Sequence, residues 1–338
     1  MAGFNKLDDW LRERAGDDPV IGAAAAVIGT IARTADEVAR AVARGPLNEG
    51  LEDKPLAEVY AALDARAREL FLNALADLPV ARIARESGPV AQGKADGPVA
   101  VALDALNGSS NIDANTSPGT LFSIWPEKGE DTFKGPGTEM IAAGLIIYGP
   151  RTGMAFTAGE GLRIATRDPD DGTFYVTAET RTLPEDHARE YAVNASNYRF
   201  WDDAIRTYVD DMIDGADGPR EQDYNMRWAA SLVAETVRII NRGGIFLYPA
   251  DSRPGFGAGR MKLLFHAHPV AYIIEQAGGM ATDGKARILE KACGDDPHRR
   301  TPLIFGSRPE VERLARYYDL PLGGSRSPLF SRRGLFRM

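Results

Sequence analysis

The chain has 338 residues, of which 44% are hydrophobic and 26% charged, and its formal net charge of −8 argues against general nucleic-acid binding. Its single cysteine, Cys293, excludes an intramolecular disulfide and a zinc site built from several cysteines. The sequence has no apolar run near the roughly 20 residues that span a bilayer and no apolar signal core in its first residues, so we expect a cytoplasmic protein without a membrane partner.

The first 76 residues favour two long helices. Apolar residues recur at helical spacing over Asp18–Arg44, with Pro19 in the first turn and Gly45 as an end signal. A second amphipathic helix is predicted over Leu56–Leu75, and it carries Asp64. The Ala-rich face of the first helix could pack on the body of the fold or on another subunit, and the sequence does not choose between them.

The stretch Val99–Trp125 combines features of an anion site. It runs from an apolar strand to Asp104, then through an Asn-Gly-Ser-Ser turn to a second apolar strand. Asp104 can face a metal ion at the strand's carboxyl edge, while the amides of Gly108, Ser109 and Ser110 point at an anion. A plain hairpin turn with a surface aspartate fits the same letters, because Asn-Gly is a common turn dipeptide.

The rest of the chain reads as strands followed by alternating helices and strands, which indicates an α/β layer. Strands are predicted over Val80–Ala84, Met140–Tyr148, Gly153–Ala158, Leu162–Thr166, Thr173–Val176, Tyr191–Asn194, Ile245–Tyr248 and Arg260–His266. Helices are predicted over Trp201–Ile213, Ser231–Asn241, Pro269–Gln276 and Pro309–Tyr318. We expect two halves, 1–185 and 186–320, and a tail over 321–338.

Three carboxylates could form a phosphoryl-transfer site. Glu86 and Asp104 each follow an apolar strand, and Asp64 lies on a nearby helix. Carboxylates beside an anion-binding turn suggest a divalent cation, and their oxygens suit Mg²⁺ or Mn²⁺. Five side chains of the second half could bind a sugar phosphate: Asn194, Tyr198, Arg227, Tyr248 and Arg260. The tyrosines could equally be half-buried core residues, and the arginines could be solvated surface residues.

Several motifs resemble the class 1 fructose-1,6-bisphosphatases. The run Asp104–Asp113, followed by Gly119–Ile124, is similar to that family's D-P-L-D-G-S-S-N-I-D and G-T-I-F-x-I signature. Further matches occur in the family's order, and together they span roughly residues 20–310: Asn194–Arg199, Asn225–Trp228, Gly243–Ala250 and Pro269–Ala281.

The resemblance implies the layered α/β (α+β) sandwich of sugar phosphatases. It also implies metal-dependent hydrolysis of the 1-phosphate of fructose 1,6-bisphosphate to fructose 6-phosphate, in gluconeogenesis or the Calvin cycle. The expected partners are this small sugar bisphosphate and further copies of the chain, as a homotetramer or dimer.

Residue by residue, the resemblance implies catalytic roles for Asp64, Glu86 and Asp104. The implied metal ligands are Glu86, Asp104, the carbonyl of Leu106, Asn107 and His266. The implied substrate contacts are Asn107, Gly108, Ser109, Ser110, Asn194, Tyr198, Arg227, Tyr248 and Arg260.

Three positions depart from the family pattern in one direction. Ser87, Asn107 and His266 stand where the pattern has carboxylates, so up to three negative charges are missing around the expected cation. Mg²⁺ depends on such charge, whereas an imidazole such as His266 suits Mn²⁺ or Zn²⁺ better. Equally, His266 and His268 could be strand-end histidines without a metal. On the substrate side, Arg260 replaces the usual lysine.

Two interpretations follow, and the sequence does not choose between them. In one, the chain is a working fructose-1,6-bisphosphatase, with a reduced rate or an altered metal. In the other, it is a non-catalytic homologue that keeps a sugar-phosphate pocket and acts as a regulatory subunit. Action on a different small phosphate ester is a third, weaker option.

Overall fold

The structure is a computed structural model that describes residues 3–184 and 188–319. Its helices are α1 (Leu7–Ala15), α2 (Pro19–Arg44), α3 (Leu56–Ala76), α4 (Asp203–Asp214), α5 (Leu232–Arg242), α6 (His268–Gln276) and α7 (Arg308–Asp319). Its strands are β1 (Asn5–Lys6), β2 (Val80–Arg85), β3 (Ala91–Gln92), β4 (Val99–Asn107), β5 (Gly119–Pro126), β6 (Ala142–Tyr148), β7 (Thr152–Thr157), β8 (Leu162–Arg167), β9 (Phe174–Arg181), β10 (Glu190–Val193), β11 (Asn225–Met226), β12 (Ile245–Tyr248), β13 (Met261–Lys262), β14 (Met280–Thr282), β15 (Arg300–Thr301) and β16 (Leu303–Gly306).

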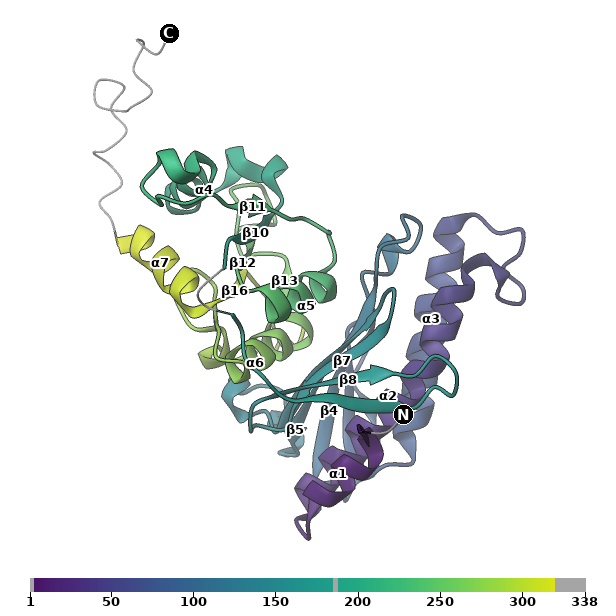
Figure 1. The fold of residues 1–338 in the computed structure, drawn as a ribbon. Helices are drawn as coiled ribbons and strands as arrows, with labels where there is room; N and C mark the ends of the chain where they lie inside the picture. Colours follow the sequence, from purple (N-terminus) through teal and green to yellow (C-terminus); the bar gives the residue numbers. More distant parts are fainter. Residues whose placement is uncertain (1–2, 185–187, 320–338) are drawn as a thin grey trace, which may run out of the picture.

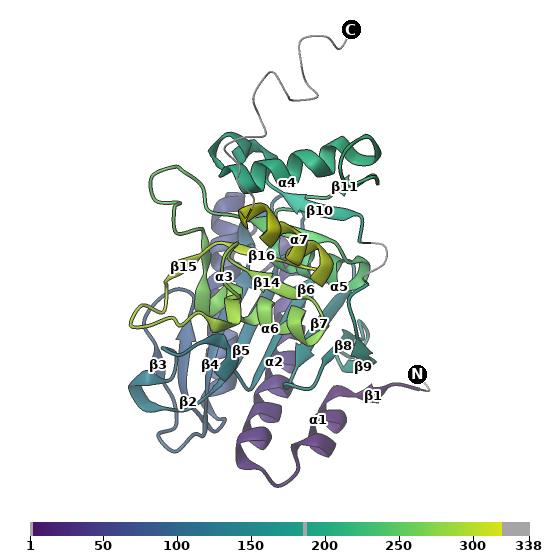
Figure 2. The same cartoon turned by 90° about the vertical axis from the view of Figure 1, so that its left-hand side faces the viewer.

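The elements stack in five layers, as the ribbon shows (Figure 1). The helices α1, α2 and α3 cover one face of a nine-stranded sheet, and α5 and α6 cover the other face. Beyond α5 and α6 lies a five-stranded sheet, whose outer face is covered by α4 and α7. The view from the side of the second half shows α7 and α4 in front of this smaller sheet (Figure 2). This is the layered α/β sandwich that the sequence predicts.

The nine-stranded sheet has the order β1-β9-β8-β7-β6-β5-β4-β2-β3. From β4 to β9, consecutive strands pair antiparallel, so this part of the sheet is a meander. In contrast, β2 and β4 run parallel, with Arg85 opposite Leu103. The residues that follow these two strands therefore lie at one edge of the sheet.

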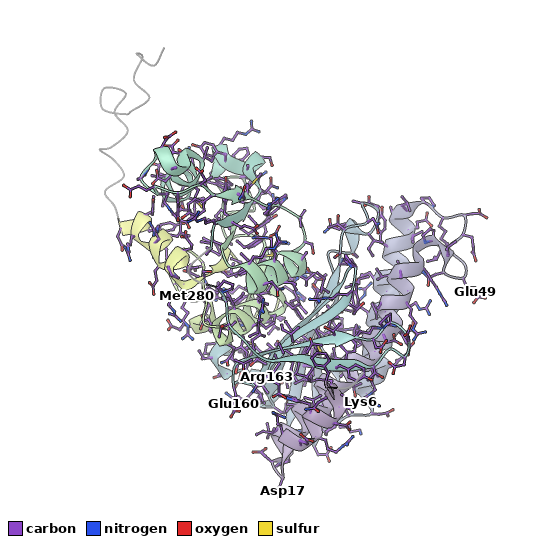
Figure 3. The ribbon with its side chains drawn as sticks, viewed as in Figure 1. Lys6, Asp17, Glu49, Glu160, Arg163 and Met280 are labelled. Atoms are coloured by element: carbon purple, nitrogen blue, oxygen red, sulfur yellow. The ribbon has the colours of Figure 1, made fainter. Side chains whose placement is uncertain are left out.

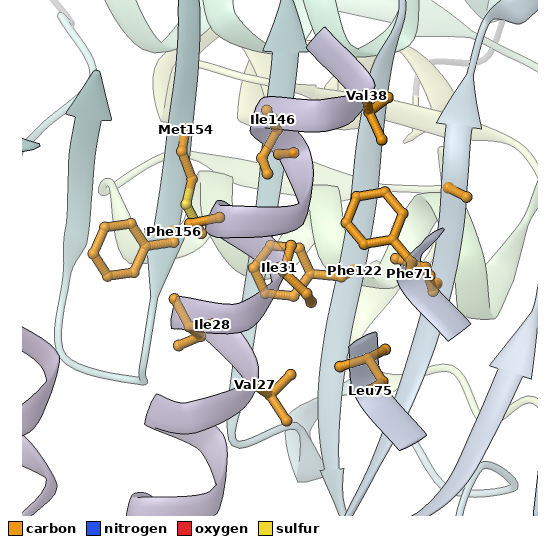
Figure 4. Close-up of a cluster of buried hydrophobic side chains, with 14 of the residues drawn as sticks. Val27, Ile28, Ile31, Val38, Phe71, Leu75, Phe122, Ile146, Met154 and Phe156 are labelled. Carbon is orange, nitrogen blue, oxygen red and sulfur yellow. The ribbon is translucent and has the colours of Figure 1, made fainter. Parts of the chain in front are cut away.

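The helix α2 forms the centre of the first core. Its N-cap, Asp18, accepts hydrogen bonds from the amides of Val20 and Ile21, and Gly45 ends it with a φ of 51°, as predicted. Its apolar stripe packs against α3 and the sheet (Figure 4), through Val27, Ile28, Ile31 and Val38 of α2, Phe71 and Leu75 of α3, and Phe122, Ile146, Met154 and Phe156 of the strands.

The loops at the two ends of α2 lie far apart. Figure 3 shows Asp17, between α1 and α2, and Glu49, between α2 and α3, at opposite extremes of the helical layer. The second loop contains the exposed apolar side chain Leu47, and Leu56 at the start of α3 is exposed as well.

Two parts of the predicted secondary structure need correction. The strand predicted over Arg260–His266 stops at Lys262, and residues Leu263–Ala267 form a π-helical turn, labelled η7. The apolar run there is buried, and a short buried run does not distinguish a strand from a helical turn. In addition, α1 is absent from the predicted elements, because only Leu7, Trp10 and Leu11 of its nine residues are buried.

The predicted tail over 321–338 and the predicted division at 185–186 lie outside the described residues. Within the described ranges, no helix is both long enough and apolar enough to span a bilayer.

Candidate active site

Glu86 and Asp104 meet at the edge formed by β2 and β4. The amide of Glu86 donates to the carbonyl of Leu103 over 3.0 Å, which extends the parallel pairing by one residue. Asp104 is buried near the end of β4, and its side chain and that of Glu86 line one small cavity together with Asp64 of α3. The structure thus brings the three predicted carboxylates together.

The turn after β4 has the backbone that its glycine suggests. Gly108 adopts the left-handed conformation with a φ of 72°, and Ser109–Asn111 form a short 3-10 helix. The chain then returns as β5, antiparallel to β4. The hairpin interpretation and the site interpretation of this stretch are therefore compatible, since the turn of the hairpin lies next to Asp104.

Glu86 is held by a basic side chain that the sequence interpretation missed. Lys262 Nζ lies 2.5 Å from Glu86 Oε1 and also donates to the Glu86 carbonyl over 2.7 Å. Ser87 Oγ donates to Glu86 Oε2 over 2.7 Å. Burial alone would raise the pKa of Glu86, but these hydrogen bonds and the nearby positive charge hold it below its ordinary value.

Asp104 receives two hydrogen bonds on one oxygen. Asn107 Nδ2 donates to Asp104 Oδ2 over 2.8 Å, and His266 Nε2 lies 3.0 Å from the same oxygen. The other ring nitrogen of His266, Nδ1, accepts the backbone N–H of Lys262 over 3.2 Å. Both ring nitrogens of His266 are therefore engaged, and a neutral ring with its proton on Nε2 satisfies both contacts.

Asp64 has the electrostatics of a proton acceptor. It forms an ion pair with Arg68 one helical turn later, with 3.0 Å between Arg68 Nη2 and Asp64 Oδ2. Burial raises the pKa of Asp64, the Arg68 guanidinium opposes that rise, and Asp104 and Glu86 add to it. The pKa ends above its ordinary value, which moves this carboxylate toward the range useful for general base catalysis.

Within the described residues, the site holds no preformed cluster of metal ligands. Among residues 3–184 and 188–319, no three His, Cys, Asp or Glu side chains form a group that could hold a metal ion. Asn107 and His266 use nitrogen atoms to bond to Asp104. His268 is fully buried, with Nε2 3.0 Å from the Lys291 carbonyl, and burial lowers its pKa to about 4.

The predicted substrate residues fall into two groups. Asn194 and Tyr248 lie at the carboxyl ends of the parallel neighbours β10 and β12, the usual edge for ligands in such sheets. Arg260 stacks its guanidinium 3.8 Å above the Phe256 ring and precedes the segment that carries Lys262 and His266. Tyr198 donates to Asp210 of α4.

Arg227 lies elsewhere. Its guanidinium pairs with Glu190, which begins β10, at 3.5 Å. Within one chain it is therefore turned away from the carboxyl edge where Asn194 and Tyr248 lie.

Two residues that form ion pairs with the carboxylates, Arg68 and Lys262, escaped the sequence interpretation for different reasons. Arg68 could have been found, because an arginine four residues after Asp64 on a helix is a typical ion-pair spacing. Lys262 gave no local signal, since its partner Glu86 is 176 residues away.

The fold and this edge of carboxylates define a class of phosphatase-like α/β proteins, and comparisons give the family. A model described as the N-terminal domain of fructose-1,6-bisphosphatase matches residues 35–179, and one for its C-terminal domain matches residues 183–319. The chain belongs to the class 1 fructose-1,6-bisphosphatase family.

Individual relatives cover nearly the whole chain. It is 45% identical over 344 residues to a class 1 fructose-1,6-bisphosphatase of Methylorubrum extorquens, with 98% of each chain covered. It is 44% identical over 341 residues to one of Rhodopseudomonas palustris, again with 98% of each covered. The holo structure of Leishmania major fructose-1,6-bisphosphatase is similar with a TM-score of 0.84 and 28% identity, covering 94% of this chain and all of that one.

Proposed function

We propose that this protein hydrolyses the 1-phosphate of fructose 1,6-bisphosphate, releasing fructose 6-phosphate and inorganic phosphate. One observation carries the proposal: in a chain of this family, β2, β4 and α3 bring Glu86, Asp104 and Asp64 to one cavity beside the Gly108 turn. The product would serve sugar synthesis, in gluconeogenesis or the Calvin cycle.

The side chains divide the work of the proposed reaction. Asp64, whose pKa is raised, would accept a proton from the attacking water. The backbone amides of Gly108, Ser109 and Ser110 would bind oxygens of the transferred phosphate, because a left-handed glycine opens the backbone to close approach.

Arg260 would bind the second phosphate of the sugar. Its side chain has no carboxylate at ion-pair distance within the described ranges, and the Phe256 ring holds it in place. Its buried Nε lacks a hydrogen-bond partner there. Asn194, Tyr198 and Tyr248 would contact sugar hydroxyls from the same edge.

The family is metal-dependent, and the choice of ion is part of the proposal. Mg²⁺ is the first candidate, and Mn²⁺ or Zn²⁺ are the alternatives that a nearby imidazole would favour. Because the donor set does not form a preformed metal site, we assign no catalytic step to the ion.

We also propose that the protein is a homo-oligomer, a tetramer or a dimer. The exposed apolar side chains Leu47 and Leu56, near the end of α2 and the start of α3, support a contact between copies. Light scattering of the purified protein measures the mass, and a monomer at micromolar concentration would contradict this.

A second candidate function is binding without turnover, as a regulatory subunit. The contacts of Lys262 with Glu86 and of His266 with Asp104 favour it, because they occupy the carboxylates that the reaction needs. The substrate-side residues would keep their role in this case.

A combined assay separates the two functions. Phosphate release from fructose 1,6-bisphosphate is measured with Mg²⁺, Mn²⁺ and Zn²⁺ in parallel, and calorimetry measures binding of the sugar. Turnover that is lost in Asp104→Asn supports the phosphatase. Binding without phosphate release under every metal would contradict it and select the regulatory subunit.

A further inference from the structure

The cavity that holds the three carboxylates has a balanced charge. Asp64, Arg68, Arg85, Glu86 and Asp104 line it, and the ammonium group of Lys262 contacts Glu86. Three carboxylates and three permanent cations therefore lie at or beside this cavity, where the Arg85 guanidinium donates to the Pro89 carbonyl. A site that binds a dication on its own normally keeps an excess of negative charge.

Lys262 holds Glu86 at two points. Its ammonium bonds to both the side-chain and the main-chain oxygen of Glu86, at 2.5 and 2.7 Å. The Lys262 side chain is only 19% exposed, so much of this ion pair is shielded from water. A cation that approached Glu86 Oε1 would first have to displace this ammonium.

His266 holds Asp104 through a fixed ring. The main-chain N–H of Lys262 donates to Nδ1 of His266, so the ring's proton lies on Nε2 and points at Asp104 Oδ2. The π-helical turn η7 brings these two residues into contact, because Lys262 is its N-cap residue and His266 lies within it. The arrangement needs no positive charge on the ring.

We propose that Lys262 and His266 are built-in counter-groups that keep Glu86 and Asp104 closed to a free divalent cation until a phosphate ester enters the site. This inference rests on the proposed function in one respect: it assumes that the same carboxylates serve the reaction. A dication alone would leave the cavity with an excess of two positive charges, whereas a dication that arrives with a phosphate dianion restores the balance. Cation binding and sugar-phosphate binding are then strongly coupled.

Titration of Mn²⁺, followed by the paramagnetic resonance signal of the free ion, tests this on the full chain. We expect the wild type to bind Mn²⁺ about tenfold or more tightly with fructose 1,6-bisphosphate than without it. The double variant Lys262→Met/His266→Gln should bind Mn²⁺ without the sugar about tenfold more tightly than the wild type. Adding Asp104→Asn to that variant should remove the gain.

Matched controls separate this effect from loss of charge or of folding. Lys6→Met removes a lysine on β1, at the opposite edge of the nine-stranded sheet from β3, and should leave Mn²⁺ binding unchanged. Lys262→Arg keeps a positive charge beside Glu86, so its Mn²⁺ binding without the sugar should stay as weak as in the wild type. Thermal melting of each variant confirms that it is folded.

One result would overturn the inference: sugar-free wild type that binds one Mn²⁺ as tightly as the double variant does. The readout is cation binding and involves no turnover. A protein that releases no phosphate can therefore still show the gain in the double variant, which distinguishes failure of the proposed reaction from failure of this inference.

Discussion

At the scale of single residues, the site depends on what each carboxylate touches. Asp104 and Glu86 are both engaged by hydrogen-bond donors, whereas Asp64 forms an ion pair with Arg68 and has a raised pKa. In the reaction that we propose, turnover depends on Asp64 as the base and on how easily Glu86 and Asp104 are released from their hydrogen-bond partners.

Asp64→Asn removes the proposed base while keeping the side chain's size. We expect phosphate release to fall by about 10²–10⁴-fold with little change in KM, because proton removal contributes to the transition state and not to binding. Steady-state kinetics with fructose 1,6-bisphosphate measures both constants. Glu69→Gln, an exposed neighbour on α3, is the control and should keep the wild-type rate. An unchanged rate in Asp64→Asn would refute the assignment.

The triple change Ser87→Glu, Asn107→Asp and His266→Glu adds three negative charges around Glu86 and Asp104. We expect the triple variant to release phosphate faster with Mg²⁺ than the wild type does. In the wild type, the basic side chains at the cavity offset the negative charge of the carboxylates, and the added carboxylates would strengthen binding of the cation. Assays over a range of Mg²⁺ concentrations measure the change. The control, Asn5→Asp, adds charge at an exposed position on β1, at the opposite edge of the nine-stranded sheet from β3. A rate that does not rise would show that the charge of this cavity does not limit turnover.

At the scale of elements, buried polar contacts fix how the outer helices sit on the small sheet. Arg220 is almost fully buried, and its Nη2 lies 2.5 Å from Glu310 Oε2 on α7. Tyr208 of α4 donates to the same oxygen over 2.6 Å. This network joins α4, α7 and the loop after α4 across the outer layer.

Arg220→Met should destabilise the protein by about 3–5 kcal/mol, because it leaves the Glu310 carboxylate buried without its cation. Arg12→Met breaks an exposed pair with Asp9 and should cost at most about 1 kcal/mol. Urea unfolding of both variants measures the difference. Equal losses for the two would contradict the role of the buried network.

At the scale of the whole molecule, His268 links stability to pH. It is buried where the start of α6 meets Trp125 of β5, and burial lowers its pKa from 6.5 to about 4. The unfolded chain then binds a proton that the folded chain does not take up between pH 6.5 and 4, so folding becomes less favourable as the pH falls through that window.

The contribution of His268 that is present above pH 6.5 and lost by pH 4 amounts to about 3 kcal/mol. His268→Gln removes the titrating ring, and we expect its stability to fall less steeply over this range than that of the wild type. Urea unfolding at several pH values measures both slopes. A variant that keeps the full wild-type slope would show that another group is responsible.

Features that depend on neighbours along the chain could be predicted from the sequence. Helical spacing with Asp18 and Gly45 predicted α2, and the strand-to-turn pattern from Val99 to Trp125 predicted the turn at Gly108. Motif resemblance predicted the family and the layered fold, and the comparisons confirm both. The individual site residues remain predictions, although Asp64, Glu86 and Asp104 do share one cavity.

The pairing of these carboxylates, in contrast, is visible only in the folded chain. The contacts of Glu86 with Lys262 and of Asp104 with His266 join residues more than 160 positions apart, and they depend on a π-helical turn where an apolar run predicted a strand. Local pattern carries no information about such contacts, because they arise from the packing of η7 against the end of β4. The contacts that hold Glu86 and Asp104 are therefore a property of the folded molecule.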